Sequence, residues 1–96
     1  MTYAPASTVT TTVRLVYLAR LREAFASAGE SLVLTSEDSP SVRSVVDALR
    51  SRGGAWAAEL ADGRAVRYAV NHRVAHPGSA LKDGDEVAVF PPVTGG

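Results

Sequence analysis

Few side chains in this sequence have the types and the spacing that catalysis or metal binding requires. His72 and His76 lie four residues apart, a spacing that would bind a metal on a helix, but they fall in a segment predicted as strand and turn, with no obvious third ligand. We interpret them as surface or structural histidines. Asp83, Asp85 and Glu86 surround a glycine, which is typical of turn carboxylates rather than of an acid–base pair.

The end of the chain is different. It reads Phe90-Pro91-Pro92-Val93-Thr94-Gly95-Gly96. Two prolines end a strand and hold the next segment extended, and the glycines carry no side chain. At about 3.3 Å per residue the last four residues reach roughly 13 Å beyond the domain. Such an end could enter a narrow channel in another protein and present its terminal carboxylate there.

The rest of the sequence predicts an α+β domain that positions this end. Strands are expected at residues 13–18, 31–35, 66–71, 73–75 and 86–90, a short helix at 20–28 ended by Gly29, and a main helix at 41–52. The main helix has apolar residues at i, i+3, i+4 and i+7, which form one stripe. Trp56 and Leu60 are expected to anchor the core. The order of elements lacks the alternation of a doubly wound fold and favours one sheet of about five strands wrapped around one main helix.

The boundaries of this domain follow from composition. Residues 1–11 are rich in Thr, Ser and Ala without a hydrophobic period, so we expect a flexible N-terminal extension. Residues 12–92 form the domain, and residues 93–96 form a flexible tail. The segments VRLVYL and VAVF are apolar on both faces, which indicates a cover beyond the main helix. The alternative is a central strand with a few exposed apolar side chains, which is common.

Composition excludes several classes of function. Ten Lys and Arg balance ten Asp and Glu, so the formal net charge is zero and the basic excess typical of nucleic-acid binding is missing. There is no cysteine, which excludes disulfides, thiolate metal sites and iron–sulfur ligation. No apolar run is long enough to span a membrane, and the N-terminus lacks the pattern of an export signal. We therefore expect a cytoplasmic protein with no nucleic-acid or membrane partner.

The sequence LKDGDEVAVFPPVTGG at residues 81–96 closely resembles the end of the MoaD-like sulfur carriers. These are the small subunits of molybdopterin synthase, in the MoaD–ThiS group with the ubiquitin-like β-grasp fold. The resemblance covers nearly all of residues 13–96, including ARLRE at 19–23, Trp56 and AVN at 69–71. The related thiazole sulfur carriers also end in Gly-Gly but typically lack this longer motif.

The resemblance implies that Gly96, preceded by Gly95, is the reactive residue. An E1-like adenylyltransferase of the MoeB type would use ATP to adenylate Gly96, and a persulfide sulfur donor would convert it to a thiocarboxylate, a C-terminal thioglycine. The MoaE-like large subunit of molybdopterin synthase would receive the tail and pass the sulfur to cyclic pyranopterin monophosphate, in molybdenum cofactor biosynthesis. The carrier itself would bind no cofactor or metal, and the catalytic acid–base groups would belong to its partners.

The resemblance also maps the hydrophobic contact positions of the family onto Leu18, Val74 and Phe90. The expected partner-binding set is completed by the residues between the last strand and the glycines, which are Pro91, Pro92, Val93 and Thr94. The competing interpretation places Phe90 in the core.

Three other functions stay open from the sequence. The first is a sulfur carrier for thiamine thiazole or another sulfur-transfer route, such as cysteine synthesis. The second is a ubiquitin-like protein modifier, although Lys82 is the only lysine of the chain. The third is a β-grasp binding module, which would leave the terminal motif without a purpose.

Overall fold

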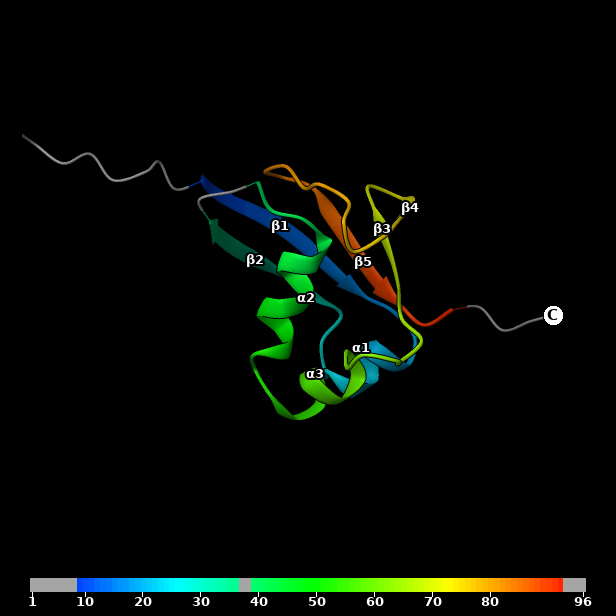
Figure 1. Cartoon of the computed structure of the whole chain (residues 1–96). Helices are drawn as coiled ribbons and strands as arrows, with labels where there is room; N and C mark the ends of the chain where they lie inside the picture. Colours follow the sequence, from blue (N-terminus) through cyan, green and yellow to red (C-terminus); the bar gives the residue numbers. More distant parts are fainter. Residues whose placement is uncertain (1–8, 37–38, 93–96) are drawn as a thin grey trace, which may run out of the picture.

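The computed structural model describes residues 9–36 and 39–92 (Figure 1). One five-stranded sheet has the order β2-β1-β5-β3-β4. The elements are β1 (Val9–Tyr17), α1 (Arg20–Ala24), β2 (Gly29–Ser36), α2 (Val42–Arg50), α3 (Gly54–Glu59), β3 (Arg67–Val70), β4 (Arg73–Ala75) and β5 (Glu86–Phe90). β1 is parallel to β5, and the other pairs are antiparallel. The predicted α+β roll is confirmed as a ubiquitin-like β-grasp.

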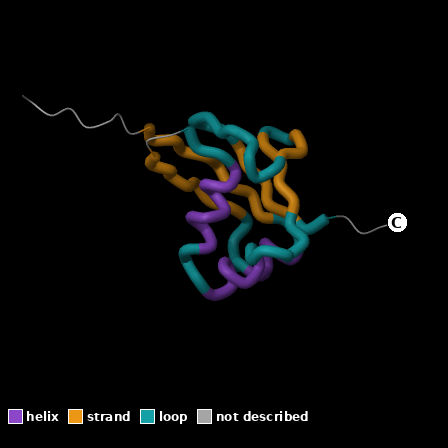
Figure 2. Tube along the Cα trace, in the orientation of Figure 1, coloured by secondary structure: helices purple, strands orange, loops and turns teal. Residues whose placement is uncertain are grey.

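The main helix α2 crosses one face of the sheet (Figures 1 and 2). Its stripe Val42, Val45 and Leu49 is fully buried. Successive residues of a strand point to opposite faces, and every second residue of β1 and β5 is buried against this stripe. The buried residues of these two strands are Thr11, Val13, Leu15, Tyr17, Val87 and Val89, and Leu34 of β2 is buried as well. This inner face of the sheet and the helices therefore form the single core of the domain.

The first strand is longer than the sequence predicted. β1 begins at Val9, and Thr10 and Thr11 pair with Thr35 and Leu34 of β2. Thr11 is buried. The predicted extension over residues 1–11 is therefore wrong for its last three residues, because β-branched threonines suit a strand although they produce no hydrophobic alternation. Residues 1–8 lie outside the described part.

The first helix is shorter than the predicted 20–28. α1 ends at Ala24, and the chain turns at Ala26, which has a φ of 51°. Phe25 is thereby directed into the core, where it is 7% exposed. Gly29 does not end the helix but begins β2, where a Cβ atom would collide with the carbonyl oxygen of Leu15. The close approach of two strand backbones therefore explains this glycine.

An aromatic cluster holds the helical end of the domain together. The ring of Phe25 stacks on Trp56 with centroids 3.9 Å apart, and Tyr17 meets both rings edge-on. The Tyr17 hydroxyl donates to Glu30 at 2.8 Å, and the Arg52 guanidinium donates to both oxygens of that carboxylate. Arg52 also lies over the Trp56 ring, 4.5 Å from its centroid. These contacts tie β1 and β2 to the turn after α1, to the link between α2 and α3, and to α3. Trp56 packs partly buried against the core, in agreement with the predicted anchor. The predicted anchor Leu60 is likewise buried.

The charges of this cluster are matched. The hydrogen bond from Arg52 lowers the pKa of the Glu30 carboxyl below its ordinary value, against the effect of its partial burial. Burial, followed by the hydrogen bond to Glu30, raises the pKa of the Tyr17 hydroxyl well above its ordinary range. Tyr17 therefore stays a protonated donor and Glu30 an ionised acceptor near neutral pH.

In the described ranges, no helix is both long enough and apolar enough to cross a lipid bilayer.

Candidate functional site

The root of the C-terminal tail lies beside the end of β1. Because β1 and β5 are parallel, their carboxyl ends meet at one edge of the domain. The Leu18 N–H donates to the Val89 carbonyl at 3.1 Å, which fixes Leu18 next to the last residues of β5. Phe90, Pro91 and Pro92 follow and are partly buried. The predicted site residues Val93, Thr94, Gly95 and Gly96 lie outside the described residues.

An apolar strip crosses the outer face of the sheet, opposite the helices. The strand registers place Val16, Ala88, Ala69 and Val74 in one row across β1, β5, β3 and β4. Leu18 and Phe90 lie next to this row at the root of the tail. We call this set the outer strip; its members are Val16, Leu18, Ala69, Val74, Ala88 and Phe90. Leu18 is 44% exposed and Val74 is 85% exposed, so the strip is a surface and not a second core.

The three contact positions expected from the sequence thus lie on one face. Leu18 and Phe90 are neighbours at the tail, whereas Val74 is separated from β5 by β3. Phe90 is partly buried but is not part of the core cluster, unlike its neighbour Val89, which is 1% exposed. The sequence interpretation missed Val16, Ala69 and Ala88. Strand alternation relative to the buried residues could have identified them, but only once the register was known.

Two arginines flank the outer strip. Arg14 lies beside Glu86 in the β1–β5 register, and Arg67 is opposite Phe90 in the β3–β5 register. Both are exposed. Among the described residues, neither has a carboxylate within ion-pair distance. Both arginines therefore lie at the margin of the outer strip outside any ion pair of the described residues, with Glu86 as the register neighbour of Arg14.

The two histidines lie in exposed turns. The His72 Nε2 atom is 3.4 Å from the Glu86 carboxylate, and the His72 side chain is 87% exposed. His76 Nδ1 accepts a hydrogen bond from the Gly78 N–H. Across the part of the chain that the structure describes, no three His, Cys, Asp or Glu residues are grouped to hold a metal ion. These positions agree with the interpretation of surface histidines.

The carboxylates near the last strand hold a turn together. Asp83 accepts a hydrogen bond from the Thr12 N–H at 2.7 Å, and Asp85 accepts one from the Lys82 N–H at 2.8 Å. Asp85 also accepts from the Asn71 side chain. These bonds fix the start of β5 against β1 and the β3–β4 hairpin. The interpretation as turn residues is confirmed for Asp83 and Asp85, whereas Glu86 is the first residue of β5.

The β-grasp sheet, the exposed apolar strip beside Phe90 and a sequence that ends in Gly-Gly together indicate a ubiquitin-like class of protein. Comparison with known families makes the assignment specific, because residues 15–96 match the ThiS family. The chain belongs to this family.

Individual relatives support the assignment. The molybdopterin synthase sulfur carrier subunit of Escherichia coli K12 is 34% identical over 84 residues, which cover 88% of this chain and 99% of the relative. Among solved structures, a Pyrococcus furiosus protein described as molybdopterin converting factor subunit 1 superposes with a TM-score of 0.72 at 28% identity, covering 86% of this chain and 99% of that one. SAMP1, the small archaeal modifier protein 1 of Haloferax volcanii, superposes with TM-scores of 0.70 and 0.60 in two crystal structures, both at 28% identity. The first covers 88% of this chain and 99% of SAMP1.

Proposed function

We propose that this chain is the sulfur carrier subunit of a molybdopterin synthase, with the terminal carboxylate of Gly96 as the group that carries sulfur. The observation that supports the proposal is the family match, which runs through to residue 96. The Escherichia coli relative that bears this name also matches over 99% of its own length. The proposed function therefore rests on likeness across the whole domain and its tail, and not on the fold alone.

The chemistry explains why the chain needs no nucleophile of its own. A carboxylate resists attack because of its negative charge, so an E1-like enzyme first joins it to AMP, and ATP loses pyrophosphate. The terminal sulfur of a persulfide donor then attacks the acyl carbon, and AMP leaves. A thiol then attacks the donor sulfur of the resulting acyl disulfide, which leaves the thiocarboxylate on Gly96 and joins the thiol to the donor as a disulfide. A second thiol reduces this disulfide and frees the donor. The large subunit supplies the acid–base groups for transfer to cyclic pyranopterin monophosphate.

The outer strip has the place that docking to the large subunit requires. Leu18 and Phe90 lie at the root of the tail, so a partner that covers them receives the tail at a fixed point. Pro91 and Pro92 hold the backbone extended as it leaves the sheet. An interface centred on a buried aromatic side chain with a polar margin is the usual arrangement of a stable complex.

Intact-mass spectrometry tests the sulfur chemistry. The full chain is incubated with a MoeB-like adenylyltransferase, ATP and a persulfide donor. We expect a mass increase equal to the replacement of one oxygen by one sulfur, which depends on ATP. The mass of a matched chain that lacks Gly96 should stay unchanged. The full chain that has gained sulfur should form product with the large subunit. A Gly96 deletion that still supports product formation would overturn the proposal.

Two related functions are separated by partner identity. A carrier for thiamine thiazole would copurify with thiazole synthase, whereas the proposed carrier copurifies with the large synthase subunit.

The likeness to a small archaeal modifier protein favours the modifier as the second candidate. A modifier would form an amide between Gly96 and a lysine of another protein. After trypsin digestion, mass spectrometry would detect residues 83–96 attached to the target lysine, because Lys82 is the last basic residue of the chain.

A further inference from the structure

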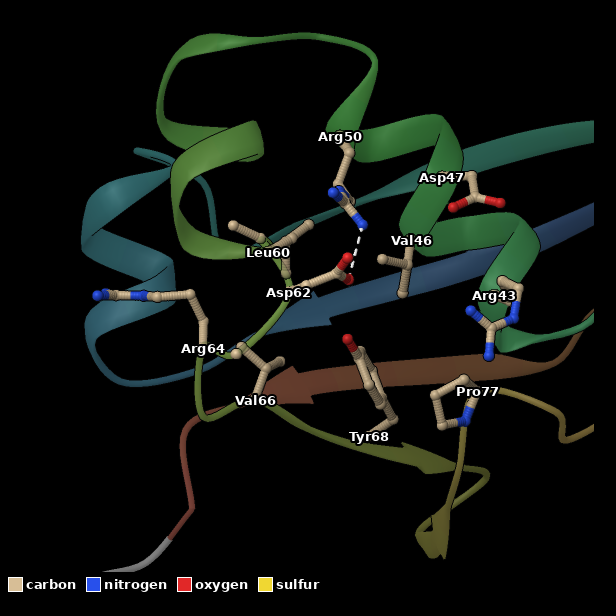
Figure 3. Close-up of a pocket in the computed structure, with 12 residues that line it drawn as sticks. Arg43, Val46, Asp47, Arg50, Leu60, Asp62, Arg64, Val66, Tyr68 and Pro77 are labelled. Atoms are coloured by element: carbon tan, nitrogen blue, oxygen red, sulfur yellow. Dashed lines mark hydrogen bonds and ion pairs between the residues drawn. The ribbon is translucent and has the colours of Figure 1, made fainter.

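A cavity lies on the helix side of the sheet, away from the outer strip (Figure 3). It has a volume of about 210 Å³ and lies between α2, the link over residues 60–66 and β3. Tyr68 lines it, whereas the next residue, Ala69, belongs to the outer strip. Because successive strand residues point to opposite faces, the cavity and the outer strip are on opposite sides of the sheet. The proposed docking to the large subunit makes no use of this cavity.

The cavity combines apolar walls with unused hydrogen-bond donors. Val46, Leu60 and Val66 line it, and Figure 3 shows the Tyr68 hydroxyl directed toward the space below α2. Within the described ranges this hydroxyl makes no hydrogen bond, and because no fully buried side-chain polar atom there lacks a partner, the hydroxyl reaches solvent. Arg43, on α2, has no carboxylate within ion-pair distance among the same residues.

The cavity is lined by three arginines, Arg43, Arg50 and Arg64, and by two carboxylates, Asp47 and Asp62, so positive charge is in slight excess around the Tyr68 hydroxyl. Burial raises its pKa, and the charges of Arg50 and Arg43 act against this rise. Arg43, Arg50 and Tyr68 line the same cavity, so a group that binds there meets both guanidinium groups and the hydroxyl. Arg50 pairs with Asp62 at 3.3 Å, but the Asp62 carboxylate is 97% exposed. Such an exposed pair contributes little, so a ligand carboxylate could replace Asp62 at Arg50.

The size of the cavity decides what kind of ligand fits. Sites for whole small molecules usually enclose roughly 300–1,000 Å³, and this cavity is smaller, at about 210 Å³. It has room for one aliphatic or aromatic side chain. The donors at its mouth match carboxylates, which pair with guanidinium groups through charge-assisted hydrogen bonds.

We propose that this cavity binds an acidic peptide segment of a partner protein. One aliphatic or aromatic side chain of the peptide enters between Val46, Leu60 and Val66, and a neighbouring carboxylate binds Arg43, Arg50 and the Tyr68 hydroxyl. This partner is additional to the one that covers the outer strip. Because the two sites are on opposite sides of the sheet, both can be occupied at once.

An NMR titration of the full, isotope-labelled chain tests the proposal. The probe is the blocked peptide Asp-Glu-Leu-Asp-Glu, and the matched control peptide is Asn-Gln-Leu-Asn-Gln. We expect the acidic peptide to shift the amide signals of α2 and of residues 60–68, and to bind about tenfold or more tightly than the neutral one. The outer strip should show no shifts, so the result does not depend on the sulfur-carrier proposal.

Variants locate the site. The double substitution Arg43→Gln with Arg50→Gln should weaken binding about tenfold or more, and Tyr68→Phe should weaken it a few-fold. Arg73→Gln removes an exposed charge outside the cavity and is the matched control, with unchanged affinity expected. Thermal unfolding of each variant verifies that the domain is intact.

Four results would overturn the proposal. The acidic peptide could fail to bind at millimolar concentration, or the neutral peptide could bind equally well. The double variant could bind like the unchanged protein. Inorganic phosphate alone could also reproduce the shifts with the same affinity, which would assign the cavity to small anions instead of a peptide.

Discussion

The two faces of the sheet use alternate residues of the same strands for different purposes. Tyr17 is fully buried in the aromatic cluster, whereas Leu18, the next residue, is 44% exposed at the root of the tail. Val89 is 1% exposed, and Phe90 after it lies on the outer face outside the core. One residue of each pair therefore stabilises the fold, while its neighbour is available to a partner.

The two faces also differ in the size of their side chains. The inner face carries mainly valine and leucine side chains with the ring of Tyr17, and these groups form one core with the helices. In the middle of the outer strip, Ala69 and Ala88 are small, and the larger Leu18, Phe90 and Val74 lie around them. A surface that is shallow in the centre and bordered by larger apolar groups suits close contact with another protein. It also limits the apolar area exposed when the partner is absent.

The sharpest test of this comparison is a pair of neighbouring substitutions. Tyr17→Ala should lower the free energy of unfolding by about 3–5 kcal/mol, because it removes a buried ring and leaves a cavity. Leu18→Ala should lower it by less than about 1 kcal/mol, because the side chain is largely in solvent. Urea unfolding followed by circular dichroism measures both. Equal losses would mean that the outer strip is part of the core.

Phe90→Ala tests the other side of the comparison. We expect its affinity for the large synthase subunit to fall by about 2 kcal/mol or more, because an aromatic anchor at the centre of an interface contributes much of the binding energy. The stability of the isolated chain should change little. Isothermal titration calorimetry measures the affinity.

Val33→Ala is the matched control for Phe90→Ala. Val33 is 58% exposed on β2 and is not part of the outer strip, so its loss should leave affinity unchanged. A large loss of stability in Phe90→Ala, with unchanged affinity of the folded fraction, would place Phe90 in the core instead.

The polar part of the aromatic cluster predicts a smaller, pH-dependent effect. The pKa of Glu30 is lowered in the fold from its ordinary value of 4.5, mainly by the hydrogen bond from Arg52. The ionised form is therefore favoured in the folded state. Its contribution is complete above about pH 4.5 and is lost as the pH falls through the lower native pKa. Glu30→Gln should cost about 1–2 kcal/mol at neutral pH and weaken this acid dependence.

Urea unfolding at a series of acidic pH values, for the unchanged protein and for Glu30→Gln, measures the difference. Taking the difference between the two proteins removes the contribution of Glu59, whose pKa is also lowered, mainly by its hydrogen bond from Arg64. Parallel pH profiles would contradict the assigned role of the carboxylate.

Elements with a clear periodic pattern could be predicted from the sequence. The stripe of α2 and the limits of β4 and β5 agree with the prediction, because apolar period and turn residues both mark them. The start of β1 did not agree, since threonines pair well in a strand but give no apolar signal. The end of α1 did not agree either, because Phe25 is buried from a turn, where helical spacing has no meaning.

The candidate sites divide in the same way. Leu18, Val74 and Phe90 were identified by resemblance, and the terminal glycines by their position. Ala69 and Ala88 join the outer strip only through the β3–β5 register, which depends on pairing between strands far apart in the chain. The cavity beside Tyr68 combines α2, a loop and β3, and no local pattern connects them.

The smallest expected effect is that of salt on affinity for the large subunit. The chain has a formal net charge of zero, so steering by net charge is weak, and burial of the outer strip is insensitive to screening. Arg14 and Arg67 at the margin are exposed, and marginal charges act mainly on the association rate. Raising sodium chloride from about 0.05 to 0.5 M shortens the range of these charges and should weaken binding by less than about tenfold. Stopped-flow and equilibrium titrations should show that salt acts mainly on the association rate constant. The double substitution Arg14→Gln with Arg67→Gln should make the salt dependence of the affinity smaller still. A loss of most of the affinity would mean that charge, and not the apolar strip, holds the complex together.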